Sequence, residues 1–299
     1  MGVPQLPILR LAPWILMATV VSASVWVYFE SRSNDANHRT GGDAVAHVHA
    51  LAIDASDTVY AATHRGLYRI EGDGTTSRVG ESYQDTMGFI VVGAGHFLGS
   101  GHPDVAGRQA GQPPLLGLIE STNGGASWSA ISLSGEADFH GLDSANGTIF
   151  GWDSSTRTFM TSADRRTWDR RSEIDLYGFV VDREQVDLVI GAAPDGIVRS
   201  TDGGRTWSVP TSPQLVALTD DDRGDLWGAD ASGAVWTSVD GVEWSASGAV
   251  HGEPTAIAAQ DDQLWIAVLD DDRRTSIRWS TDQGGSWTVV YEEPSPVGS

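Results

Sequence analysis

The sequence predicts an all-β protein, a six-bladed β-propeller, preceded by a single N-terminal transmembrane helix. The first observation is a short polar turn ending in tryptophan that occurs five times, at residues 121–128, 162–168, 200–207, 238–244 and 280–287. The second is the spacing of these tryptophans, which are 40, 39, 37 and 43 residues apart, as expected for a repeated supersecondary unit. The third is that runs of four to six β-prone residues lie between the turns, with no sustained helical period.

Each repeat of about forty residues predicts four short antiparallel strands, which is the make-up of one propeller blade. Residues 176–209 show the pattern, with strands expected at 177–181, 187–191, 197–200 and 206–209. A unit without the tryptophan turn comes first, with strands expected at 49–53, 58–62, 66–70 and 75–79. The six predicted blades span residues 45–80, 85–133, 137–172, 175–210, 214–250 and 252–292.

The tryptophan turns resemble the Asp-box, a Ser-x-Asp-x-Gly-x-x-Trp motif found on sialidases and on many unrelated propellers. Three of the five copies keep the full spacing, and the first of these has Asn123 in place of aspartate. In such a turn the Asp or Asn side chain accepts hydrogen bonds from backbone N–H groups, glycine supplies a positive φ, and the tryptophan buries its ring between strands. We therefore interpret the motif as structural, on the face away from the mouth of the channel. The structural residues are Ser121, Asn123, Trp128, Asp164, Trp168, Asp202, Trp207, Asp240, Trp244, Asp282 and Trp287.

Residues 1–30 are expected to be a membrane anchor or a signal peptide. Residues 11–29 carry no charge, and at a rise of about 1.5 Å per residue they nearly span the roughly 30 Å hydrocarbon core. Val21-Ser22-Ala23 is a candidate cleavage site, but the apolar and aromatic end of the segment favours an uncleaved anchor. A linker follows at 31–44, then the propeller at 45–292 and a tail at 293–299. The expected location is the cell membrane, single-pass with an extracytoplasmic propeller, or the secreted fraction if the signal is cleaved.

Composition excludes several classes of site and partner. The chain has no cysteine, which excludes disulfides and thiolate metal sites. Its 19 basic residues, all arginine, face 40 acidic residues, for a net charge of −21. This charge argues against nucleic acid or an anionic lipid surface as a partner. A small molecule, a metal or an extracytoplasmic protein remains as the expected partner.

Two positions on the innermost strand of each blade carry polar residues in one register. Aligned on a small-then-apolar step, the residue just before the step is, blade by blade, His49, Met87, His140, Tyr177, Val216 and Thr255. Two positions earlier lie His47, Asp85, Asp138, Asp175, Gln214 and Glu253. These two positions share one side of a strand. The turn between the second and third strands opens on the same face and carries His64, Arg65, His102 and Asp153.

Five of the eight histidines gather on the first three blades, and this asymmetry points to a site at the channel mouth. The candidate metal ligands are His47, His49, His64, His102, His140, Asp85 and Met87. Imidazole with carboxylate suits zinc, or copper where the thioether of the methionine takes part. The candidate ligand-binding residues are Asp138, Asp153, Asp175, Tyr177 and Arg65. Two other interpretations stay open: buried His/Asp pairs that only satisfy polarity, and a pocket for an organic ligand or a peptide.

Over residues 45–290 the chain resembles a bacterial family of BNR/Asp-box repeat β-propellers whose members carry the name glycosyl hydrolase. The matching stretches are HVHALAID (47–54), ATHRGLY (62–68), MGF (87–89), GSGHPD (99–104), GLIESTNGGASW (117–128) and EADFHGL (136–142). More distantly the blades look like sialidase-like, sortilin-like and photosystem assembly-factor propellers, and the last two kinds bind proteins and catalyse nothing. The resemblance implies the propeller fold, and it implies hydrolysis only through the Asp-box.

The function we expect is therefore binding, by an exported and membrane-tethered propeller whose His/Asp-rich site on the first four blades holds a metal, a ligand or a protein. We expect binding rather than catalysis; if the chain is an enzyme, a glycosidase-type hydrolase is expected. The alternative is a glycoside hydrolase that uses carboxylates at the same channel mouth. A typical sialidase is excluded, because the Arg-Ile-Pro signature expected near the first blade is missing and Tyr177 has no matched glutamate.

Overall fold

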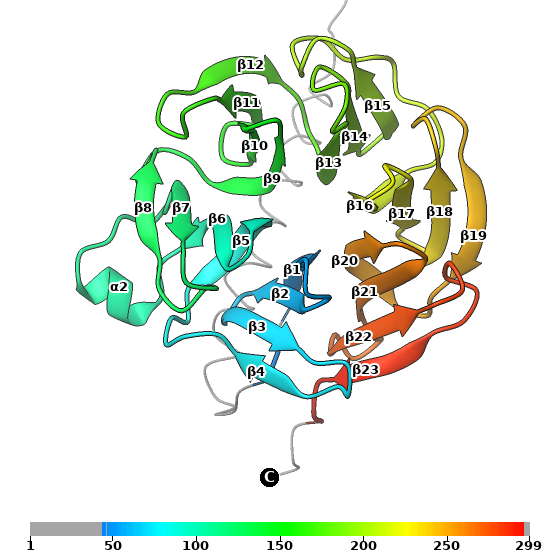
Figure 1. Cartoon of the computed structure of the whole chain (residues 1–299), viewed down its shortest axis with the longest axis horizontal. Helices are drawn as coiled ribbons and strands as arrows, with labels where there is room; N and C mark the ends of the chain where they lie inside the picture. Colours follow the sequence, from blue (N-terminus) through cyan, green and yellow to red (C-terminus); the bar gives the residue numbers. More distant parts are fainter. Residues whose placement is uncertain (1–43, 46, 296–299) are drawn as a thin grey trace, which may run out of the picture. The chain divides into compact units, whose positions relative to one another are not determined.

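Six antiparallel sheets surround a central channel in the computed structural model, which describes residues 44, 45 and 47–295 (Figure 1). This confirms the prediction of an all-β, six-bladed propeller. The predicted transmembrane segment, residues 11–29, lies outside the described residues. Within the part of the chain that the structure describes, no helix is both long enough and apolar enough to cross a membrane.

Consecutive strands build each blade, from the channel outward. The first two blades contain β1 (Val48–Ile53), β2 (Val59–Thr63), β3 (Gly66–Ile70) and β4 (Thr76–Arg78), then β5 (Asp85–Gly93), β6 (His96–His102), β7 (Leu118–Ser121) and β8 (Ser129–Ser132). The next two contain β9 (Phe139–Ala145), β10 (Thr148–Asp153), β11 (Thr158–Ser162) and β12 (Asp169–Glu173), then β13 (Gly178–Val181), β14 (Val189–Ala193) and β15 (Gly196–Ser200). The last two contain β16 (Leu215–Asp220), β17 (Leu226–Asp230), β18 (Ala234–Ser238) and β19 (Ser245–Ala249), then β20 (Glu253–Gln260), β21 (Gln263–Leu269), β22 (Thr275–Ser280) and β23 (Thr288–Glu292).

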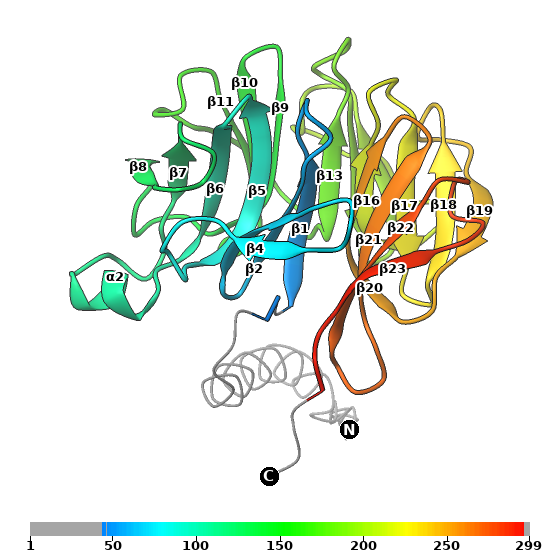
Figure 2. The same ribbon diagram turned by 60° about the horizontal axis from the view of Figure 1, so that its bottom comes forward.

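The order of the strands fixes which loops share a face. Each sheet pairs its strands in chain order, so the innermost strand is an edge strand, and its first residue lies at the same end as the turn between the second and third strands. The short helix α2 (Val105–Gln109) follows the second strand of its blade, and Figure 2 shows it at the end of the ring where β1 begins. The tight turn into β3 requires glycine, since a Cβ on Gly66 (φ +100°) would lie 2.6 Å from Ser82 O.

The fourth blade has three strands, so the outer strand predicted at residues 206–209 is wrong. Arg199 N donates to the side-chain Oγ of Ser208 (3.0 Å) in addition to the bond from Ser208 N to Arg199 O (2.9 Å). Pro210 has no N–H to continue a ladder. Beyond these contacts, the described residues of this blade pair the segment after the turn with β15 only through an isolated bridge between Ile197 and Thr211.

The Asp-box turns connect the third and fourth strands, at the end of the ring opposite to the start of β1. In the fourth blade, Ser200 Oγ accepts a hydrogen bond from Gly204 N (2.8 Å). Asp202 Oδ1 accepts from Arg205 N and Thr206 N (3.0 and 2.9 Å). The serine-to-glycine contact recurs at Ser121, Ser238 and Ser280. The carboxylate of Asp202 is used in hydrogen bonds to the backbone N–H groups of its own turn. It therefore stabilises the turn and is not available to a ligand.

The tryptophans of these turns connect neighbouring blades. Trp207 Nε1 donates to Ser172 Oγ on the outer strand of the preceding blade (2.9 Å). Trp168 Nε1 and Ser132 Oγ make the same contact one blade earlier (3.0 Å). The rings are half-buried rather than fully buried, because each packs one side on a neighbouring core, as Trp207 does on Phe159 (ring centroids 5.3 Å apart). The motif thus fixes each turn and joins it to the blade before it.

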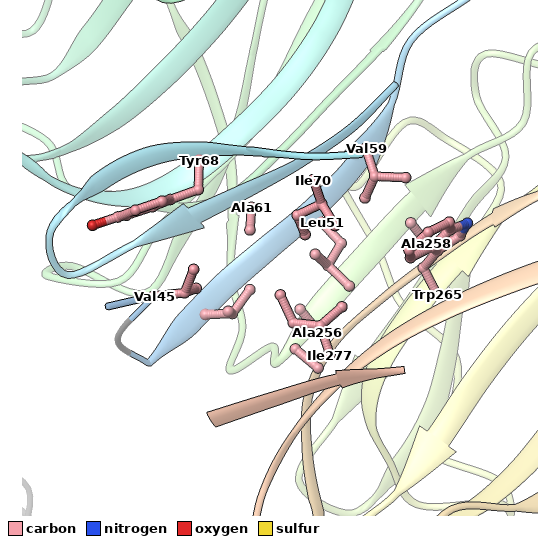
Figure 3. Packing of buried hydrophobic residues seen from close by; sticks show 12 residues of the cluster. Val45, Leu51, Val59, Ala61, Tyr68, Ile70, Ala256, Ala258, Trp265 and Ile277 are labelled. Atoms are coloured by element: carbon pink, nitrogen blue, oxygen red, sulfur yellow. The ribbon is translucent and has the colours of Figure 1, made fainter. Parts of the chain in front are cut away.

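Side-chain packing between the first and sixth blades closes the ring, since no sheet of the described residues contains strands from both ends of the chain. Figure 3 shows this buried apolar cluster, in which Leu51 and Ala61 of the first blade lie near Ala256 and Ile277 of the sixth. Burial of such apolar surface is the main stabilising contribution in a fold whose ends are not joined by a strand.

Candidate functional site

Four histidines and two aspartates from the first three blades lie at one mouth of the channel. Their places follow from the strand order: two follow the starts of β1 and β9, two lie in or beside the turns between second and third strands, and the aspartates begin or precede an inner strand. They are His49, His64, Asp85, His102, Asp138 and His140. The structure therefore brings together residues that are as many as 91 positions apart in the sequence.

Three donor atoms of this group form a triangle. His49 Nε2 lies 3.1 Å from His64 Nδ1, and each lies close to Asp85 Oδ1, at 3.3 and 3.0 Å. The side chain of His49 is only 11% exposed, and those of His64 and Asp85 are 24% and 23% exposed. Within the described residues, these three form the one group of histidine and carboxylate side chains whose ligand atoms are close enough to share a metal ion.

No protonation state satisfies all three contacts of this triangle. A hydrogen bond joins one donor to one acceptor, and three mutually close atoms must include a pair with the same role. Asp85 Oδ1 is an acceptor when ionised. Either both ring nitrogens donate and then face each other, or one of them faces the carboxylate as a second acceptor. A cation removes the conflict, because all three atoms can then direct lone pairs towards it.

The polar network continues from the triangle into the third blade. His102 Nδ1 lies 3.6 Å from Asp85 Oδ2, and His102 Nε2 lies 3.5 Å from Asp138 Oδ2. The same oxygen of Asp138 lies 2.9 Å from His140 Nε2 and accepts a hydrogen bond from Ser154 Oγ (3.1 Å). Asp138 Oδ1 is buried without a hydrogen-bond partner in the structure. The network therefore holds its two carboxylates between histidines of three blades.

Both carboxylates of the network are ionised at neutral pH. Burial raises the pKa of Asp85, but the contacts with its three histidines outweigh burial and hold this pKa well below its usual range. Burial also raises the pKa of Asp138, but the contacts with His102 and His140 outweigh burial and lower this pKa. The contacts of His102 with Asp138 and Asp85 raise its pKa to about 10. His102 is therefore a cation between two anions.

The half-buried histidines at the start of the first blade, His47 and His49, are neutral at neutral pH. Burial lowers the pKa of His49, and the contact with Asp85 only partly offsets it. Burial, together with the repulsion that a protonated His47 would meet from protonated His49 and His64, lowers the pKa of His47 to about 3. The ring of His47 lies 4.9 Å from that of His49 and 5.3 Å from that of His64. Neutral imidazole beside an ionised carboxylate is the state that binds a metal.

The other candidate ligand-binding residues do not join this network. Asp153 is fully buried, and its oxygens accept hydrogen bonds from Asp138 N and from the residues of its own turn. Asp175 is exposed and pairs with Arg157 (3.3 Å). The positions of the remaining candidates are as follows: Tyr177 is 56% exposed at the rim, Arg65 is half-buried in the turn after β2, and Met87 is buried (7% exposed) two residues after Asp85.

A cavity of about 500 Å³ fills the channel and touches the inner strand of every blade. Its wall includes His49 and His140 at one end, and Asp143, Arg183 and Asp220 at the other. This second end was not predicted from the sequence. Its residues come from two inner strands and from the loop after a third. The inner-strand register does not mark the two aspartates, because Asp143 comes two residues after the aligned small residue of its strand and Asp220 comes three residues after it.

Comparisons with known proteins support the fold alone. No protein-family model matches the chain, and no curated protein matches it. An ancestral GH74 enzyme superposes with a TM-score of 0.51 at 14% identity over 82% of this chain, which spans only 38% of that enzyme. YCF48 bound to D1 peptide superposes with a TM-score of 0.50 at 14% identity, over 73% of this chain and 74% of that one. A chain of the nidogen/laminin complex gives 0.60 at 12% identity, over 77% and 91%. These neighbours are β-propellers, and membership of the BNR/Asp-box family stays a prediction.

Proposed function

We propose that this chain is an exported, membrane-tethered β-propeller that binds zinc at the channel mouth through His49 Nε2, His64 Nδ1 and Asp85 Oδ1. The triangle of donor atoms is the observation that supports this. Tetrahedral zinc holds nitrogen and oxygen ligands at about 2.0–2.2 Å, which places neighbouring ligand atoms about 3.3–3.5 Å apart. The three separations in this chain, from 3.0 to 3.3 Å, are close to that value, so an ion fits with a small outward shift of the side chains.

The donor set favours zinc over copper. Two imidazoles and one carboxylate form a set that zinc uses, with three protein ligands and a fourth position for water or an external ligand. Copper was a candidate only if the thioether of Met87 served as a ligand, but the triangle of ligand atoms is complete without Met87. The fourth position is open to an external ligand, or to His47, whose ring lies beside both histidines of the triangle.

The binding of a partner and the location at the membrane are further parts of the proposal. YCF48 and nidogen are seen in complexes with a peptide and with a protein, which supports this class of partner for the chain. Export and tethering rest on the uncharged segment at residues 11–29. The glycosidase alternative has less support, because Asp153 is occupied by its turn and Asp175 lies outside the network.

The direct test is the zinc content of the purified full chain, measured by mass spectrometry before and after treatment with a chelator. One zinc per chain, lost to the chelator and regained from zinc solution, is the expected result. A chain that retains no zinc and binds none in a calorimetric titration contradicts the proposal.

His102 is expected to position Asp85 for the metal, because it contacts the carboxylate oxygen that the metal does not use. Replacing such a partner in other metal sites typically weakens metal affinity about 10–100-fold, and we expect this range for His102→Gln in a zinc titration. His96→Gln is the matched control, since His96 also pairs with a carboxylate, Glu120 (2.7 Å), on a strand end away from the triangle. Equal affinities in both variants would show that His102 does not support the site.

Zinc affinity is expected to fall as the pH is lowered, because protons compete for the imidazoles. The pKa of His49 lies below its usual value of 6.5, and Asp85 stays ionised to much lower pH. Protonation of His49 therefore starts to oppose zinc only below about pH 6.5. Calorimetric titrations between pH 7.5 and pH 5 check this. An affinity that rises as the pH is lowered over this interval is inconsistent with histidine ligands.

A further inference from the structure

The channel cavity connects the zinc site to an acidic mouth at the other end. Along β1 and the loop after it, the wall includes every residue from His49 to Asp54, which is five residue steps of about 3.3 Å, or about 17 Å in all. Its volume of about 500 Å³ lies in the range of pockets that hold small ligands, about 300–1,000 Å³. One zinc ligand, His49, faces this cavity, so a molecule in the channel can reach the ion.

The wall of the cavity offers backbone groups to such a molecule. All six inner strands are edge strands, each paired on one side only within the described residues, and an edge strand presents unpaired N–H and C=O groups. Small residues keep this edge accessible: Ala50, Gly178, Ala217 and Ala256 line the cavity. A Cβ added to Gly178 would meet no atom within 4 Å. An extended peptide can pair with an edge of this kind.

The two ends of the cavity differ in charge. A zinc ion held by His49, His64 and Asp85 would supply positive charge at the His49 end. At the other end a single guanidinium, that of Arg183, forms ion pairs with two carboxylates, Asp143 (3.1 Å) and Asp220 (3.2 Å). The side chains of both aspartates are only 11% exposed. Asp143 also accepts hydrogen bonds from Val181 N and, through its other oxygen, from the next backbone N–H. Asp220 is therefore the carboxylate left for a cationic group.

The titration of this pair agrees with an excess of negative charge. Burial and the charge of Asp143 raise the pKa of Asp220 to about 7, although Arg183 opposes the shift. Burial also raises the pKa of Asp143. A single guanidinium does not neutralise both carboxylates, so a ligand with an ammonium group at this end would remove the conflict.

We propose that the channel binds a short extended peptide with free termini, its C-terminal carboxylate on the zinc and its N-terminal ammonium at Asp220. The direction follows from the six inner strands, all of which run from the zinc end to the acidic end, so a peptide antiparallel to an inner strand has its carboxylate at the metal. Five extended residues span at most about 17 Å, the length of the wall from His49 to Asp54. The proposal rests on the zinc site described above, and it adds the class of ligand.

Penta-alanine with free termini is the probe, titrated by calorimetry into the zinc-loaded full chain. We expect binding that weakens by about tenfold or more when the C-terminus is amidated, and also when the N-terminus is acetylated, because each change removes a charged contact. The same peptide should bind more weakly to the zinc-free chain. Equal affinity for the free and the amidated peptide, or no binding to the zinc-loaded chain, overturns the proposal.

Gly178→Phe separates this proposal from the zinc site. The new ring has space only in the cavity, and Gly178 has no positive φ, so we expect full zinc uptake and loss of peptide binding. Gly72→Phe is the matched control, since a Cβ there also meets no atom within 4 Å but the residue is outside the cavity wall. Unchanged peptide binding in Gly178→Phe overturns the channel site while leaving the zinc site standing. A wild-type chain that takes up no zinc overturns both.

Discussion

Replacing His49 and His64 together by alanine is expected to abolish zinc binding and to leave the propeller folded. The change removes both nitrogen ligands of the triangle, and a single carboxylate cannot hold the ion at low concentration. Neither histidine belongs to the buried apolar clusters that hold the blades together. A calorimetric zinc titration measures the loss, and circular dichroism checks the fold.

The control is a second double variant, in which His96 and His251 are replaced by alanine. It removes the same number of histidines, one from a strand end away from the triangle and one from an exposed loop. We expect wild-type zinc affinity for this variant. A loss of binding in both double variants, or in neither, would mean that the triangle is not the zinc site.

Trp207→Ala is expected to lower the free energy of unfolding by about 3 kcal/mol, the lower end of the range for removing a large aromatic side chain from a core. We expect the lower end because the ring is half-buried. Trp244→Ala is the matched control: this ring lies in the same motif, but its Nε1 has no hydrogen-bond partner in the structure. We expect Trp244→Ala to lower the free energy of unfolding by about 1 kcal/mol less than Trp207→Ala does, because about 1 kcal/mol is the usual contribution of one hydrogen bond.

Denaturant unfolding followed by circular dichroism measures both losses. Zinc affinity should be unchanged in each variant, because the Asp-box turns lie at the other end of the strands from the triangle. Equal losses in the two variants would show that the contact of Trp207 with Ser172 does not contribute to joining the blades. A change in zinc affinity at unchanged stability would assign the motif to the site.

The number and order of the blades could be predicted from the sequence because the repeat is local. Each blade is built from consecutive strands, so the turn residues and β-prone runs of about forty residues are enough to define it. The outer strand of the fourth blade could not be predicted in this way. Whether residues 206–209 pair depends on Ser208, whose side chain accepts the N–H of Arg199, and on Pro210, and the β-propensity of the run gives no sign of either.

The residues at the channel mouth were identified through strand register, which places i and i+2 on one side. Register does not show how a side chain is used. Asp153 was placed at the mouth by its turn between the second and third strands, as His64 was, but its oxygens accept hydrogen bonds from its own turn, through Ser155 and Thr156. The acidic end was missed, because Arg183 contacts aspartates 40 and 37 residues away in two other blades, and no local pattern encodes such a contact.

The most direct measurement is anomalous X-ray diffraction at the zinc edge from crystals of the zinc-loaded chain. The account predicts one peak at the channel mouth, about 2.0–2.2 Å from His49 Nε2, His64 Nδ1 and Asp85 Oδ1. Crystals that bind zinc only elsewhere, or that show no peak at these three atoms at saturating zinc, would contradict it.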